Sequence, residues 1–185
     1  MKNKIDFSFI SRLEGGQQLE AYVPAGNISR SGVTLATGFD LGARNVDDLK
    51  KIQLSGALIE KLTPYLGLIK IDAVNKLELA PLTISSQEAD EIDEASKASA
   101  TQRLMIRYDA AIKSDQDQFA ELPPEAQTVI ASVAFQYGDL ATRTPLFWQA
   151  VINQDWSKTV AILNDFHDAY PTRRRKEAEL LQTIL

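Results

Sequence analysis

Residues 31–42 spell SGVTLATGFDLG, a stretch typical of neither a helix nor one regular strand. Three glycines interrupt it, two threonines stand three residues apart, and a carboxylate, Asp40, follows Gly38 and Phe39. Glycine lets a backbone turn tightly, and the β-branched residues between the glycines favour extended structure. The stretch therefore predicts a small hairpin that carries hydroxyl groups and one acid on a tight backbone.

The residues before the hairpin predict a short helix and more short strands. Asp6 or Ser8 could cap a helix whose apolar positions are Phe9, Ile10 and Leu13. Gly15-Gly16 must end it, because paired glycines favour leaving a helix. LEAYVP (19–24) and GNISRS (26–31) then predict strands, with a turn signal at residues 24–27. A sheet this small needs other elements to cover it.

From residue 45 onward the signals are helical. Ser85-x-x-Glu88 is a capping box that opens a long helix reaching residue 113. The other expected helices lie within 46–54, 56–62, 71–80, 123–138, 144–153, 155–166 and 172–184. The predicted fold is therefore α+β and mainly helical, a single domain over 1–185 in which a small lobe (1–44, first helix plus sheet) packs on a larger helical lobe (45–185).

Composition excludes several classes of function. The 185 residues include no cysteine and one histidine, which rules out disulfides, thiolate zinc sites and thiol catalysis and leaves no histidine-rich metal site. A net charge of −5 argues against nucleic-acid binding. The basic run RRRK (173–176) is followed by acids and is interpreted as a solvated helix face. No apolar run is long enough to span a membrane.

Acid–base chemistry is thus left to carboxylates. Glu14 stands at the expected end of the first helix, where the helix dipole disfavours an ionised acid, as a general acid requires. Asp40 could face it from the hairpin, and paired carboxylates are the usual equipment for glycoside hydrolysis. Thr34 and Thr37 cannot share one face of a regular strand, so one could bind water or sugar while the other supports the sheet. Each pattern also fits a bland alternative: a solvated acid, or threonines that simply favour strands.

The combination of Glu14, LEAYVP and SGVTLATGFDLG resembles the active-site region of the phage-type lysozymes, and is closest to the branch that includes the catalytic domain of the bacteriocin pesticin. That resemblance implies a lysozyme-like fold and a catalytic triad of Glu14, Thr34 and Asp40. The better-known phage enzymes place their aspartate before the threonine, just after a tyrosine. Here that position reads Tyr22-Val23-Pro24, without an acid.

Two substrate contacts complete the expected site. VAFQYG (133–138) resembles the helix that lines the cleft floor in this family, which implies Gln136 as a glycan contact, and Thr37 is the second expected contact. Glu20 is the main competing acid for a catalytic role beside Glu14 and Asp40, because it starts a strand close to Glu14 in the sequence.

The resemblance implies an enzyme that cleaves the β-1,4 bond between N-acetylmuramic acid and N-acetylglucosamine in peptidoglycan and needs no metal or organic cofactor. The alternatives are a lytic transglycosylase and a non-catalytic peptidoglycan-binding domain. The start of the sequence lacks the pattern of a secretion signal, so we expect synthesis in the cytoplasm and action on the cell wall in the periplasm of a host or target bacterium. A phage endolysin and an antibacterial effector or toxin both fit. Expected partners are glycan strands and a delivery machinery or immunity protein; neither nucleic acid nor membrane insertion is expected, and the chain is expected to be a monomer.

Overall fold

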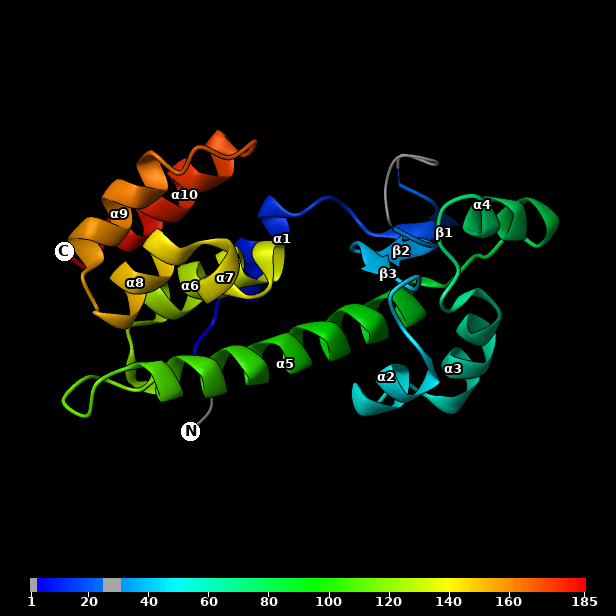
Figure 1. Cartoon of the computed structure of the whole chain (residues 1–185), viewed down its shortest axis with the longest axis horizontal. Coiled ribbons are helices and arrows are strands. Elements are labelled where there is room, and N and C mark those ends of the chain that lie inside the picture. Colours follow the sequence, from blue (N-terminus) through cyan, green and yellow to red (C-terminus); the bar gives the residue numbers. More distant parts are fainter. Residues whose placement is uncertain (1–2, 25–30) are drawn as a thin grey trace. The chain divides into compact units, whose positions relative to one another are not determined.

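The computed structural model describes residues 3–24 and 31–185 and has the expected mainly helical α+β architecture (Figure 1). Its helices are α1 (Phe7–Leu13), α2 (Val46–Lys51), α3 (Gly56–Leu62), α4 (Lys70–Leu79), α5 (Ser86–Ala111), α6 (Pro124–Tyr137), α7 (Leu140–Arg143), α8 (Pro145–Ile152), α9 (Trp156–Asn164) and α10 (Pro171–Gln182). The strands are β1 (Gln18–Tyr22), β2 (Thr34–Ala36) and β3 (Phe39–Asp40), and two 3-10 turns lie at Thr63–Tyr65 and Phe119–Glu121. The strand predicted over 26–31 and the turn at 24–27 fall largely outside the described residues.

The chain divides into two compact units, which differ from the two lobes expected from the sequence. The sheet unit is Glu14–Ser99, and the helical unit combines Met1–Leu13 with Ala100–Leu185. The sequence pattern predicts instead that the first helix belongs to the sheet lobe and that all residues after 44 belong to the helical lobe. That the chain forms one domain stays a prediction.

Packing explains why α1 belongs with the helical unit. The backbone N–H of Lys4 donates to Oε1 of Gln127 at 2.7 Å, and that of Asp6 donates to Oγ1 of Thr128 at 2.9 Å. The rings of Phe7 and Phe135 stack with their centroids 6.2 Å apart. All three partners are on α6, a helix that is distant in sequence, so no local pattern around residues 4–13 could have indicated them.

In the sheet unit, a three-stranded antiparallel sheet in the order β1-β2-β3 shares one core with the helices that follow it. Buried side chains of this core come from the sheet, α2, α3 and α5, and include Val33, Leu35, Leu41, Leu49, Leu58, Leu62, Ala89 and Ile92. At the start of α5, Ser85 and Glu88 make both hydrogen bonds of the predicted capping box, at 3.2 and 2.7 Å. The helices α2, α3 and α5 therefore supply the cover that the small sheet lacks.

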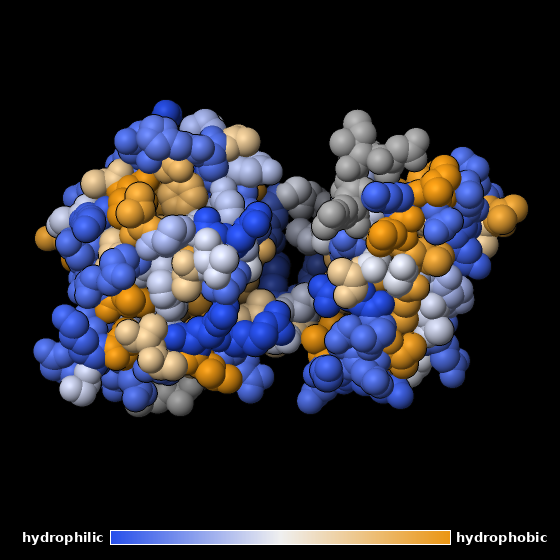
Figure 2. Space-filling model, in the orientation of Figure 1, coloured by the Kyte–Doolittle hydropathy of each residue, from blue (hydrophilic) through white to orange (hydrophobic). Residues whose placement is uncertain are grey.

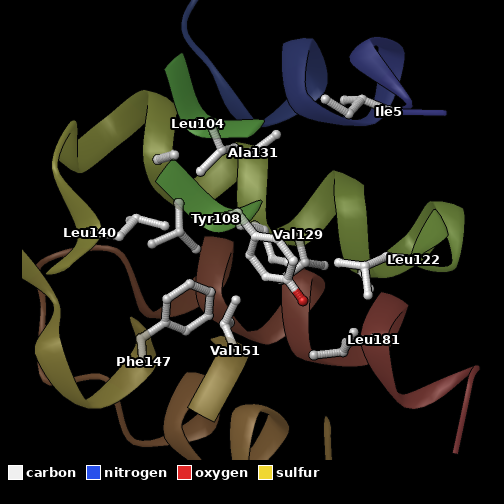
Figure 3. Packing of buried hydrophobic residues seen from close by; sticks show 14 of the residues in the cluster. Ile5, Leu104, Tyr108, Leu122, Val129, Ala131, Leu140, Phe147, Val151 and Leu181 are labelled. Atoms are coloured by element: carbon white, nitrogen blue, oxygen red, sulfur yellow. The ribbon is translucent and has the colours of Figure 1, made fainter. Parts of the chain in front are cut away.

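In the helical unit, α6 is buried continuously from Ala126 to Ala134 and forms the centre of a second core. Figure 3 shows Tyr108 of α5 surrounded by apolar side chains of this core, among them Val129 and Val151. The Tyr108 ring also meets the rings of Phe119 and Trp148 edge-on, with centroids 5.6 and 6.3 Å apart.

The interpretation of residues 173–176 as a solvated helix face was wrong in one respect. Arg174 is only 1% exposed and Glu177 is fully buried. Both oxygens of Glu177 have cationic partners, because Arg174 pairs with Oε2 and Nε of Arg173 lies 3.1 Å from Oε1. Ser132 of α6 also donates a hydrogen bond to Oε1. Packing of α10 on α6 buries this cluster, and a run of charged letters alone does not show that burial.

The surface of each unit is mostly polar. Figure 2 shows hydrophilic side chains over most of the visible face of each unit, with hydrophobic side chains interspersed. None of the helices in the described ranges is both long and apolar enough to cross a membrane.

Candidate active site

Thr34 and Asp40 lie directly opposite each other on the neighbouring strands β2 and β3. Opposed residues of an antiparallel pair have Cβ atoms about 5 Å apart on the same face of the sheet. Thr34 is only 3% exposed, and its hydroxyl donates to the carbonyl oxygen of Gly32 at 3.1 Å. The hydrogen of the Thr34 hydroxyl is thus committed to the backbone, and its oxygen remains able to accept a hydrogen bond.

Two backbone N–H groups hold the Asp40 carboxyl in place. Oδ1 of Asp40 accepts from the backbone N–H of Gly32 at 3.0 Å and from that of Gly42 at 2.7 Å. The two glycine backbones approach so closely that a Cβ built on Gly42 would lie 2.7 Å from the Cα of Gly32. Side chains at either position would force these backbones apart. The glycines on each side of the hairpin therefore fix the direction of its acid.

Arg44 secures the end of the same hairpin. Its Nε donates to the backbone oxygen of Asp40 at 2.9 Å, and its guanidinium carbon lies 4.0 Å from the centroid of the Phe39 ring. Backbone and side chain of Asp40 are thus restrained independently.

Glu14, the expected general acid, belongs to the sheet unit together with Thr34 and Asp40. It is the first residue after α1 rather than its last. Its Oε2 is buried and has no hydrogen-bond partner among the described residues, although Nζ of Lys97 lies 3.6 Å away. A buried carboxyl oxygen without a hydrogen bond is uncommon in proteins and marks a candidate functional group.

Glu20, the competing acid, is exposed on β1. Its backbone forms an isolated bridge with Thr83. Its exposure gives it the surroundings of an ordinary surface acid, unlike Glu14.

Thr37 lies in the turn between β2 and β3 and is bound twice by one carboxylate. Its backbone N–H donates to Oδ1 of Asp93 at 3.1 Å, and its hydroxyl donates to Oδ2 at 2.6 Å. The sequence analysis expected Thr37 to contact substrate and did not single out Asp93, which stands in an acid-rich run of α5. The contact of Thr37 with substrate stays a prediction, and the structure adds an anchoring role for its hydroxyl.

Gln136 belongs to the helical unit, whereas Glu14, Thr34 and Asp40 belong to the sheet unit. The contacts described for Gln136 are therefore those within the helical unit. Its Oε1 accepts a hydrogen bond from Arg174, which also pairs with Asp168 at 2.8 Å. The side-chain oxygen of Gln136 is thus part of the polar cluster on α10. Its contact with glycan stays a prediction.

Tyr22 is a site candidate that the sequence analysis did not propose. It lies opposite Thr34 on β1, so that Tyr22, Thr34 and Asp40 follow one line across the three strands. Its side chain is 40% exposed. Aromatic side chains commonly line ligand sites, and the tyrosine in LEAYVP was the available signal.

The described residues contain no group of three or more histidine or acidic side chains arranged to hold a metal ion. What the sheet unit offers instead is a carboxyl group with an unbonded oxygen, a second carboxyl group fixed by backbone donors, and a buried hydroxyl opposite it. These are the elements of general acid catalysis with an activated water.

Comparison with known proteins agrees with this chemistry. A family model named Pesticin, described as a bacterial toxin homologue of phage lysozyme, C-terminal region, matches residues 4–157. The chain belongs to the pesticin family. The matched range includes Glu14, Thr34, Asp40 and Gln136, and it ends before α10. No curated protein matches the sequence.

Membership of the pesticin family supports a lysozyme-like glycoside hydrolase or toxin that acts on peptidoglycan. The resemblance found in the sequence and the fold class expected from it are both confirmed.

Proposed function

We propose that the protein is a muramidase that hydrolyses the β-1,4 bond between N-acetylmuramic acid and N-acetylglucosamine. The observation that carries this proposal is the opposed pair Thr34 and Asp40, in the same unit as Glu14, whose Oε2 has no hydrogen bond from any residue that the structure describes. Family membership supplies the class of substrate.

Glu14 is the general acid in this mechanism. It donates its proton to the glycosidic oxygen as the bond to the anomeric carbon breaks and an oxocarbenium-like state develops. Among the described residues Oε2 has no hydrogen-bond partner, so a proton on this oxygen is not already shared with another protein group when substrate arrives.

Asp40 and Thr34 act on the water. The Thr34 hydroxyl donates to Gly32, so towards water its oxygen serves as an acceptor. A water that donates one hydrogen to Thr34 and the other to the Asp40 carboxylate keeps a lone pair for the anomeric carbon. Asp40 then takes the proton as the water attacks, or stabilises the positive charge that develops on the sugar.

The separation of the two carboxyl groups in the substrate complex decides the stereochemistry. About 6.5–9.5 Å leaves room for the water and gives inversion, whereas about 5–5.5 Å gives retention through a covalent intermediate. The water bridge between Thr34 and Asp40 belongs to the inverting route.

We further propose that the protein reaches its substrate in the periplasm of a bacterium. The family description as a bacterial toxin homologue supports an antibacterial effector or toxin, and the likeness to phage lysozyme leaves an endolysin as the alternative. Either role requires delivery to the wall.

The test is the loss of turbidity of purified peptidoglycan, combined with mass spectrometry of the released fragments. We expect wild type to release fragments with reducing ends and Glu14→Gln to be slower by about a thousandfold, the scale of a lost general acid. Glu20→Gln is the matched control, because it removes an exposed acid of the same unit, and it should retain wild-type activity.

Three other results would contradict the proposal in different ways. Fragments ending in anhydro-muramic acid, with Asp40→Asn as active as wild type, would identify a lytic transglycosylase. Binding to peptidoglycan without any release by wild type would identify a binding domain. An equal loss of fragment release in Glu14→Gln and Glu20→Gln would show that Glu14 is not the specific general acid.

A further inference from the structure

One face of α5 contacts both segments that carry the proposed catalytic groups of the sheet unit. Asp90, Asp93 and Lys97 are spaced by three and four residues, so their side chains project from the same side of the helix. We call these three residues the α5 face. Each of them has a partner either in the β2–β3 turn or in residues 14–17.

The first contact holds the hairpin turn. Asp93 accepts both the backbone N–H and the hydroxyl of Thr37. On either side of Thr37, Ala36 has a φ of 49° and Gly38 a φ of 79°. A left-handed conformation is unfavourable for alanine, so this turn needs interactions that hold it. The paired bonds from Asp93 act at its centre, between the strands that present Thr34 and Asp40.

The second contact holds the segment of Glu14. Nε2 of Gln17 donates to Oδ1 of Asp90 at 2.8 Å and to Oδ2 of Asp93 at 3.0 Å. Nζ of Lys97 lies 3.6 Å from Oε2 of Glu14 itself. The same carboxylate of Asp93 therefore joins the Glu14 segment, through Gln17, to the hairpin turn, through Thr37.

We propose that the α5 face is a positioning platform, in which Asp93 fixes the β2–β3 turn relative to Glu14 so that acid and water site act on one glycosidic bond. Asp93 and Thr37 are positioning residues: they act through Glu14, Thr34 and Asp40 and do not take part in proton transfer. This inference rests on the proposed function. A misplacement of about 1 Å between reacting groups can lower a rate by about a hundredfold without changing the groups themselves.

The test compares kcat, KM and unfolding in urea for Asp93→Ala, Thr37→Val and Thr37→Ser. We expect Asp93→Ala and Thr37→Val to lower kcat by about ten- to a hundredfold with KM nearly unchanged, because alignment is lost while the binding surface remains. Thr37→Ser keeps the hydroxyl and should stay within about threefold of wild type. Glu94→Gln, an exposed acid next to Asp93 on α5, is the matched control and should not differ from wild type.

A double variant separates positioning from independent effects. Since Asp93 and Thr37 act through one contact, Asp93→Ala combined with Thr37→Val should lose no more kcat than the worse single variant. A double variant whose loss of kcat equals the product of the two single losses would overturn the platform. Wild-type kcat in both Asp93→Ala and Thr37→Val would overturn it as well. A higher KM with an unchanged kcat would also overturn the platform, because it would identify Thr37 as a substrate contact.

The platform and the proposed function fail in distinguishable ways. An active wild type, an inactive Glu14→Gln and a fully active Asp93→Ala would overturn only the platform. A wild type that releases no fragments would overturn the proposed function, and with it the positioning role. If Asp93→Ala is unfolded, the comparison of Thr37→Val with Thr37→Ser decides, because the first replaces the hydroxyl by a methyl group and the second keeps the hydroxyl and removes the methyl group.

Discussion

Glu14 in the sheet unit and Glu177 in the helical unit are both glutamates, but their carboxyl groups differ in how well they are paired. Glu177 is fully buried, and both its oxygens are paired, with Ser132, Arg173 and Arg174 as partners. Among the described residues no group forms a hydrogen bond with the buried Oε2 of Glu14, and Nζ of Lys97 lies 3.6 Å from it. Burial raises the pKa of Glu177, while the guanidinium groups of Arg174 and Arg173 and the Ser132 hydroxyl act in the opposite direction.

The difference separates a carboxyl group used for structure from one available for chemistry. A buried charge that is fully paired joins the elements around it, and removing one member leaves the others unpaired. The buried oxygen of Glu14 has only the 3.6 Å ion pair with Lys97 and no hydrogen bond from the described residues, so this carboxyl group contributes less to the fold than Glu177 and can act on an incoming substrate. Natural proteins tolerate such local departures from good pairing mainly at functional sites.

The largest effect on stability is expected at Glu177. Glu177→Gln leaves two guanidinium groups next to a neutral amide, and we expect the free energy of unfolding to fall by about 3 kcal/mol or more, as for other broken buried ion pairs. Urea unfolding followed by circular dichroism measures it. Glu179→Gln, an exposed acid on the same helix, is the control and should stay within about 0.5 kcal/mol of wild type.

Equal stability of the Glu177 and Glu179 variants would break the comparison, because the pairing of Glu177 would then contribute nothing to the fold. Molecules of Glu177→Gln that remain folded should release peptidoglycan fragments at nearly the wild-type rate.

Tyr108 is a second buried titratable group, and its effect on stability is expected at alkaline pH. Burial raises the pKa of Tyr108 from 10.0 to about 12, with Gln154 donating the one hydrogen bond that opposes this shift. Above pH 10 the unfolded chain loses this proton while the folded chain keeps it, so stability falls as pH rises. The loss accumulates between pH 10 and pH 12 and amounts to about 2 kcal/mol at pH 12.

Urea unfolding at a series of alkaline pH values tests this expectation. Tyr108→Phe keeps the ring in the core shown in Figure 3 and should lose less stability with rising pH than wild type. Tyr170→Phe, at a tyrosine that is 52% exposed, should follow the wild-type curve. Identical curves for both variants would mean that Tyr108 ionises as freely as a surface tyrosine.

The smallest effect is expected for the stability of Glu14→Gln. Removing a poorly satisfied acid should leave the free energy of unfolding unchanged or raise it by up to about 1 kcal/mol, as seen for functional groups that are not optimised for stability. Glu20→Gln provides the baseline for an exposed acid of the same unit. A loss of more than about 1 kcal/mol in Glu14→Gln would show that Glu14, like Glu177, is used for structure.

Much of the hairpin could be predicted because its determinants are local. Glycines at both ends of SGVTLATGFDLG and the six-residue step from Thr34 to Asp40 fix a turn in which the two residues meet on adjacent strands. The capping box at Ser85 and Glu88 was likewise confirmed because both partners lie within one helical turn. The resemblance to the lysozymes added residue roles that local geometry alone does not assign.

The sequence by itself thus determined the mainly helical class, the glycine-bounded hairpin and the family. Tertiary structure alone decided that α1 packs with the helical unit, that Arg174 and Glu177 are buried, and that Asp93 binds Thr37. The physical reason is distance along the chain. Thr37 and Asp93 are 56 residues apart, and Ser132 and Glu177 are 45 apart. Whether a charged residue on a helix meets water or a partner depends on what packs against it, and that is settled only when distant segments come together.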